Sequence, residues 1–127
     1  MRADLRPEAG QATVELVLAL PFVALVLAGL VQVGWVVADQ VRLWHGAREA
    51  ARAAAVEPGR SAALEAARRS GLAPLDLEIS PASVSRVAGQ PVTIHLAYRP
   101  RSVVPFASGL MSAVELRAEA TMRIEEP

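Results

Sequence analysis

The chain has 127 residues, which leaves room for one long helix and one small domain of about 70 residues. Its 13 basic and 13 acidic residues give a formal net charge of zero, which argues against a nucleic-acid partner held by bulk positive charge. Cysteine is absent, so disulfides, cysteine zinc sites and a cysteine nucleophile are excluded.

A long apolar stretch follows a polar leader, which we place at residues 1–10. From Leu16 to Ala38 the chain carries no charge over 23 residues, and a helix of that length spans roughly 34 Å. The hydrocarbon core of a bilayer is about 30 Å thick, and a helix satisfies its own backbone groups in lipid. We therefore predict a transmembrane helix over residues 11–38. Its apolar core is longer than that of a cleavable secretory signal.

Two features inside the span predict how this helix is shaped and how it meets other helices. Pro21 removes one backbone donor and is expected to kink the helix. Gly34 and Ala38 are small residues four positions apart, a spacing that lets a second helix approach closely.

The helix is expected to continue beyond the span, because no stop signal occurs at Asp39 and apolar residues keep a helical spacing up to Val56. Its second half carries small side chains, which make a shallow face on which a sheet can lie close. These small residues are Gly46, Ala47, Ala50, Ala51 and Ala54.

The remainder predicts a small α+β domain within residues 39–127. A short second helix is expected from about Ser61 to Ser70, with Ser61 as its cap. Three later stretches alternate apolar and polar residues, which predicts a three-stranded antiparallel sheet packed by one face on the long helix. These stretches are residues 75–80, 92–99 and 114–125.

The connection at residues 99–113 has more apolar side chains than a surface loop usually carries. Three interpretations remain open for it: it tucks under the sheet, touches the membrane or meets a partner.

Glu15 stands at the amino-terminal edge of the apolar stretch, and it allows two interpretations. It can mark the water interface at a helix start, where a carboxylate also suits the helix dipole. Alternatively, the step from Gly10 to Glu15 is a processing signal, in which cleavage after Gly10 leaves Gln11 as a new amino terminus.

Three blocks of the sequence carry a resemblance to a known family. They are GQATVELVLALPF at residues 10–22, HGAREAARAAAV at residues 45–56 and LRAEATMRIEE at residues 116–126. In this order and spacing they resemble the TadE-like proteins, the pseudopilins or minor pilins of tight-adherence (Flp) pili.

The resemblance implies a single-pass membrane protein with its amino terminus in the cytoplasm and its carboxyl-terminal domain outside. It implies that a prepilin peptidase cuts the Gly10–Gln11 bond and that Glu15 is the glutamate at the fifth mature position. A carboxylate among packed apolar helices needs a positive partner. The new amino terminus would supply one, so we interpret Glu15 as setting helix register. The implied partners are the membrane, other pilin-like subunits and the pilus assembly platform.

We expect no catalytic, metal or cofactor site and no small-molecule substrate. His45 and His95 fall on different elements, and a metal site needs more converging ligands. The serines have no plausible His–Asp partners, and no glycine-rich phosphate loop occurs. The preferred function is a pilin-like subunit or assembly factor that acts by helix packing. The alternative is a membrane-anchored extracytoplasmic binding module without a pilus role.

Overall fold

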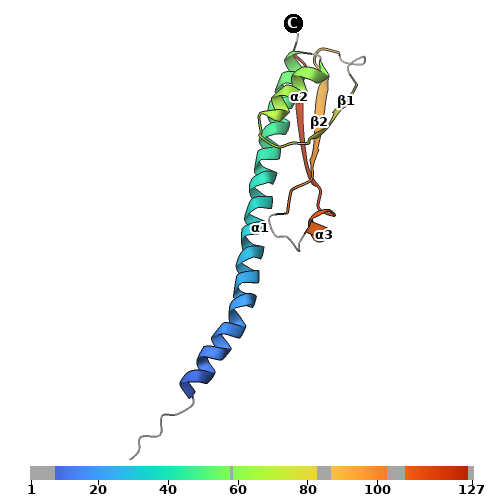
Figure 1. Ribbon diagram of the computed structural model, residues 1–127. Helices are drawn as coiled ribbons and strands as arrows, with labels where there is room; N and C mark the ends of the chain where they lie inside the picture. The colour runs from blue at the N-terminus through green and yellow to red at the C-terminus, as the bar shows by residue number, and fades with distance from the viewer. Residues whose placement is uncertain (1–7, 58, 83–86, 103–107, 126–127) are drawn as a thin grey trace, which may run out of the picture.

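A computed structural model describes residues 8–57, 59–82, 87–102 and 108–125, and it confirms the predicted α+β class (Figure 1). A long helix runs the length of the molecule, and a small domain packs on its carboxyl-terminal half. In chain order the elements are α1 (Glu8–Val56), α2 (Arg60–Arg68), β1 (Asp76–Ser80), β2 (Pro91–Tyr98), α3 (Ser108–Met111) and β3 (Leu116–Arg123).

Helix α1 is a single unbroken element of 49 residues, which corresponds to about 73 Å of helix. It passes Asp39 without interruption, because nothing there removes a donor or favours a turn. Pro21 lies inside the helix and cannot donate to the carbonyl of Val17. The amino-terminal turns of α1 incline away from the rest of the helix (Figure 1), as a missing hydrogen bond at a proline produces.

The three strands form one antiparallel sheet in the order β1-β2-β3. Its register aligns residues of like polarity across the strands. Leu77, Leu96 and Ala118 make one row, and all three side chains are buried. The next row, Glu78, His95 and Glu119, is exposed. The period-two pattern in the sequence therefore separates a covered face from a solvated one.

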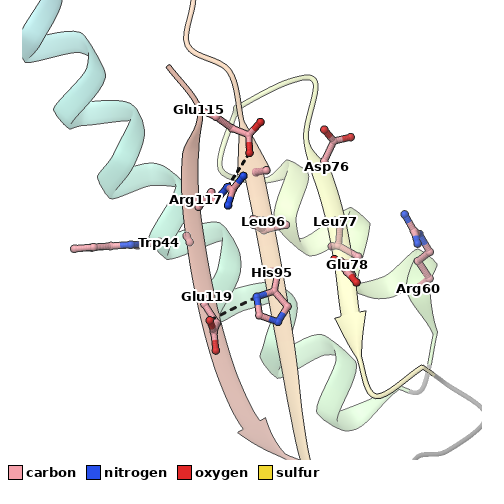
Figure 2. A pocket seen from close by; sticks show the side chains of 12 residues that line it. Trp44, Arg60, Asp76, Leu77, Glu78, His95, Leu96, Glu115, Arg117 and Glu119 are labelled. Carbon is pink, nitrogen blue, oxygen red and sulfur yellow. Dashed lines mark hydrogen bonds and ion pairs between the residues drawn. The ribbon is translucent and has the colours of Figure 1, made fainter. Parts of the chain in front are cut away.

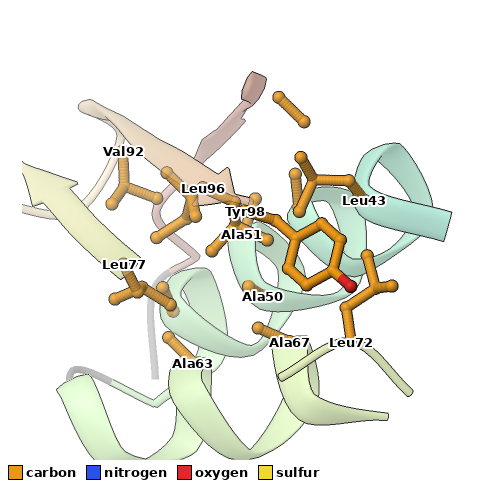
Figure 3. Packing of buried hydrophobic residues seen from close by; sticks show 14 of the residues in the cluster. Leu43, Ala50, Ala51, Ala63, Ala67, Leu72, Leu77, Val92, Leu96 and Tyr98 are labelled. Atoms are coloured by element: carbon orange, nitrogen blue, oxygen red, sulfur yellow. The ribbon is translucent and has the colours of Figure 1, made fainter. Parts of the chain in front are cut away.

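The core lies between the covered face of the sheet and the carboxyl-terminal half of α1, which also packs against α2 (Figure 3). The helix contributes mainly alanines, and the sheet contributes the larger side chains. Small side chains on one surface and large ones on the other interdigitate at close backbone separation. The fully buried members include Leu43, Ala47, Ala50, Ala51, Val92 and Ile94.

Helix α2 begins at Arg60, one residue before the predicted start, and it ends at Arg68. Its N-cap is Gly59 in an extended conformation with no side-chain cap bond, so the predicted cap at Ser61 is wrong. Gly71 follows with φ of 79°, a left-handed conformation that glycine adopts without a Cβ penalty.

Gly46 of α1 faces α2. A Cβ placed on Gly46 would lie 3.1 Å from the Cβ of Ser70 and 3.3 Å from the carbonyl oxygen of Ala67. The predicted small-residue face of α1 therefore meets α2 at Gly46, and only part of it serves the sheet.

Strands β1 and β3 are shorter than the sequence pattern suggested, whereas β2 has the predicted length and begins one residue earlier, at Pro91. Leu75 precedes β1 and Val114 precedes β3. The connection predicted at residues 99–113 also contains one helical turn, α3. Part of that connection, residues 103–107, lies outside the described residues.

Candidate functional site

The amino-terminal half of α1, which we call the bare half, runs from Gly10 to Val31. None of its side chains is buried, although nearly all of them are apolar. Phe22 is 70% exposed and Leu18 is 65% exposed. From Leu16 onward the bare half carries no charge, and an apolar surface of this length requires lipid or other apolar helices around it.

Among the described residues, α1 is the one helix long and apolar enough to cross a membrane, by its length and composition (Figure 1). The predicted span of residues 11–38 falls within it.

The proposed processing site lies in the first turns of α1. The helix begins at Glu8, so Gly10 and Gln11 are helical. A Cβ added to Gly10 would have nothing within 4 Å. Gln11 and Glu15 are both exposed and are four residues apart, which places them on one face of the helix. An amino group created at Gln11 would therefore lie about one helical turn from the Glu15 carboxylate.

The two predicted small residues near the end of the span differ in their surroundings. Gly34 is exposed, and an added Cβ would meet nothing within 4 Å. Ala38 is half-buried, because the small domain covers one side of α1 at this level. Gly34 therefore leaves room for close approach from outside.

The small residues of the second half of α1 point inward. Gly46, Ala47, Ala50, Ala51 and Ala54 are all buried. They are used in contacts within the chain, with α2 and the sheet, and a second helix has no access to them.

Gln32 forms a contact that the sequence does not predict. Its side chain is only 6% exposed, although it lies in the apolar span. Its Nε2 donates to the carbonyl oxygen of Arg101 at 3.4 Å and to the Sδ of Met111 at 3.2 Å. An isolated polar side chain within an uncharged stretch could have indicated a buried polar contact. Its partners could not be identified from local sequence, because they lie 69 and 79 residues away.

One further polar contact attaches the domain to α1 just beyond Gln32, and an ion pair within α1 lies beside it. Gln40 Nε2 donates to the carbonyl oxygen of Arg117 in β3 at 2.9 Å. Asp39 is 9% exposed, and its Oδ1 lies 3.5 Å from Nη1 of Arg42. Burial of Tyr98, followed by the nearby Asp39 charge, raises the pKa of the Tyr98 hydroxyl above its usual value. Polar residues thus mark the change from the bare half to the part of α1 covered by the domain, Leu43 to Ala55, which we call the packed half.

The solvated face of the sheet carries a charged depression (Figure 2). His95 Nδ1 lies 3.5 Å from Glu119 Oε2. Glu115 accepts hydrogen bonds from Arg117 at 2.8 Å and Arg99 at 3.4 Å. The bond and charge of Arg117 hold the pKa of the Glu115 carboxyl below its usual value.

Mixed charges of this kind suit a solvated surface. Within the described ranges no group of three metal-ligating side chains converges, and His45 lies on α1, away from the strand that carries His95.

The model of the TadE-like protein family matches residues 10–52. This match confirms the family resemblance over the first sequence block and most of the second, whereas the third block, residues 116–126, lies outside it. It covers the bare half of α1 and most of the packed half, and it ends before α2. No curated protein and no solved structure matches the chain.

Proposed function

We propose, from the TadE-like match over residues 10–52, that this chain is a pilin-like membrane subunit or assembly factor of a tight-adherence pilus or related secretion system. The observation that carries the proposal is the bare half of α1, which lies within the matched region. A helical segment in which no apolar side chain is buried is suited first to lipid and then to a bundle of similar helices. The protein would act by packing that helix and would catalyse no reaction.

In the proposed topology, residues 1–10 are a cytoplasmic leader and the domain after Asp39 lies outside the cytoplasm. Protease added to intact spheroplasts should then degrade the domain and leave the bare half protected. Protection of the domain would contradict this orientation.

A prepilin peptidase would cut the Gly10–Gln11 bond. The position of Gly10 supports this step, because it lies at the polar end of the bare half, where a membrane enzyme can reach it. Gly10→Leu should leave a precursor about ten residues larger than the mature form. Mass spectrometry of the native amino terminus provides the measurement, and a chain that begins at Met1 would contradict processing.

Glu15 would set the axial register of the assembled helices. An unpaired carboxylate in an apolar bundle costs several kcal/mol, and the new amino terminus at Gln11 would offset that cost at one register only. Glu15→Gln should keep the protein in the membrane and impair piliation.

Glu49→Gln is the matched control, because Glu49 is an exposed glutamate in the other half of the same helix. We expect this variant to support normal piliation. Normal piliation with Glu15→Gln would contradict the register role. Normal piliation in a strain that lacks the gene would contradict the pilus function itself.

A further inference from the structure

We propose that α3 contacts the outer surface of a phospholipid bilayer beside the spanning half of α1, with Leu110 inserted among the acyl chains. This proposal rests on the proposed function, because it requires that α1 crosses the bilayer with the domain outside. The structure describes every residue on which the proposal depends, namely the span, Trp35 at its outer boundary and Leu110.

The position of α3 is fixed by Gln32. The Gln32 amide donates to the carbonyl oxygen of Arg101 and to the sulfur of Met111, the last residue of α3. Figure 1 shows α3 below the sheet, beside the middle of α1. The small domain therefore extends down the helix as far as Gln32.

The depth of Gln32 follows from the length of the span. A hydrocarbon core of about 30 Å corresponds to about 20 helical residues. The 20 residues that follow Glu15, the charged residue at the edge of the span, end at Trp35. The Trp35 side chain is 49% exposed, and tryptophan favours the membrane interface. Gln32 lies about one helical turn deeper. The contacts of Gln32 therefore place α3 at the boundary between headgroups and acyl chains.

The side chains of α3 suit that boundary. Leu110 is 76% exposed, the highest value among the exposed large apolar side chains of the described residues. The turns that follow α3 satisfy their own polar groups. Ser112 Oγ donates to the carbonyl oxygen of Gly109 at 2.7 Å. The amide of Val114 donates to the carbonyl oxygen of Met111 at 3.0 Å. Arg101 is exposed beside this turn, where its guanidinium can reach lipid phosphates while its stem lies on apolar groups.

The absence of cysteine from the sequence makes a site-specific test straightforward. Single-cysteine variants Leu110→Cys, Leu25→Cys and Val87→Cys are labelled with an environment-sensitive fluorophore. The full-length protein is then reconstituted at low density in phosphatidylcholine–phosphatidylglycerol vesicles. Leu25 is the positive control, because it is 51% exposed near the middle of the span.

Val87 is the matched negative control. It is an exposed apolar residue of the same domain, at 58%. The amide of Gly89, in the turn that begins at Val87, donates to the carbonyl oxygen of Ile124. The next residue, Glu125, donates through its amide to the carbonyl oxygen of Ala55. Ala55 lies 23 residues beyond Gln32, about 35 Å along α1.

We expect the label at position 110 to emit at shorter wavelength than the label at position 87. It should lose most of its fluorescence to lipid nitroxides placed near the headgroup end of the acyl chain. Nitroxides near the methyl end of the acyl chain should quench the label at position 25 more strongly than the label at position 110.

Three results would overturn the proposal. Quenching at position 25 but not at 110 would show that α3 stays out of the lipid, while the membrane anchor stands. A blue-shifted label at 110 that lipid nitroxides do not quench would assign the contact to protein. Absence of quenching at both positions would contradict the membrane anchor of the proposed function as well.

Discussion

Both halves of α1 carry many apolar side chains, but they place them in opposite surroundings. The bare half is rich in valine and leucine, and none of its side chains is buried. The packed half, from Leu43 to Ala55, is rich in alanine, and its inward face is closed by α2 and the sheet. The difference teaches that the domain packs where the apolar side chains of α1 are small. Alanine lets a sheet and a helix lie close, whereas large side chains keep neighbours at a distance.

The largest effect should come from one residue type compared in the two halves. Leu43 is fully buried, whereas Leu18 is 65% exposed. Leu43→Ala should lower the free energy of unfolding of the domain by about 2–5 kcal/mol, because it removes packed atoms and leaves a cavity. Denaturant titration in detergent gives the measurement. Leu18→Ala, the control, should leave domain stability unchanged, and an equal loss in both variants would contradict the comparison.

A charge placed in each half tests the membrane side of the comparison. Val26 is 62% exposed in the bare half, and Val56 is 65% exposed at the end of α1. Val26→Arg should oppose insertion by about 2.5–3.5 kcal/mol, the cost of arginine near the middle of a span. The fraction of protein recovered in washed membranes is the readout. Val56→Arg should insert as the parent does; normal insertion of Val26→Arg would argue that the bare half is not in lipid.

Overpacking sharpens the role of the alanine face. Ala51 is fully buried and Ala24 is exposed. Ala51→Leu should cost roughly 1–3 kcal/mol of domain stability, since extra atoms would force the sheet away from α1. Protease resistance of the domain reports the loss, with Ala24→Leu as the neutral control. If both variants resist protease like the parent, the alanine face is not a tight contact.

The smallest effect concerns pH at the solvated face of the sheet. The pKa of Glu115 is held below its usual value of 4.5, chiefly by Arg117. Its ionised form therefore favours the folded state above the usual pKa, and the contribution disappears as the pH falls through the lowered pKa.

The stability difference between the parent and Glu115→Gln should be small near pH 7 and vanish in acid. Unfolding titrations across this pH range provide the measurement. Arg117→Gln should remove most of the same pH dependence, and its persistence in that variant would assign the effect to another group.

Local pattern was enough to predict most of the architecture. The uninterrupted apolar spacing through Asp39 indicated one long helix, and the structure contains it. The period-two alternation at residues 92–99 indicated a strand with one buried face, and Val92, Ile94 and Leu96 are buried in β2. In each case the signal lies within a few neighbouring residues.

The features that the sequence did not reveal depend on contacts between distant residues. The amide of Gln32 finds its partners near the carboxyl end of the chain, and no local pattern indicates this. Gly46 was read as part of the surface for the sheet, but it admits the end of α2. The cap at Ser61 was expected from residue type, whereas backbone geometry starts α2 after Gly59.

The continuity of α1 has a mechanical consequence. No linker separates its two halves, so an axial force applied to the domain is transmitted toward the amino-terminal turns through the helix itself. The one interior proline, Pro21, interrupts the ladder of hydrogen bonds, so bending under load should begin there. We therefore expect α1 to be stiff along its length except near Pro21, which lies well away from the domain.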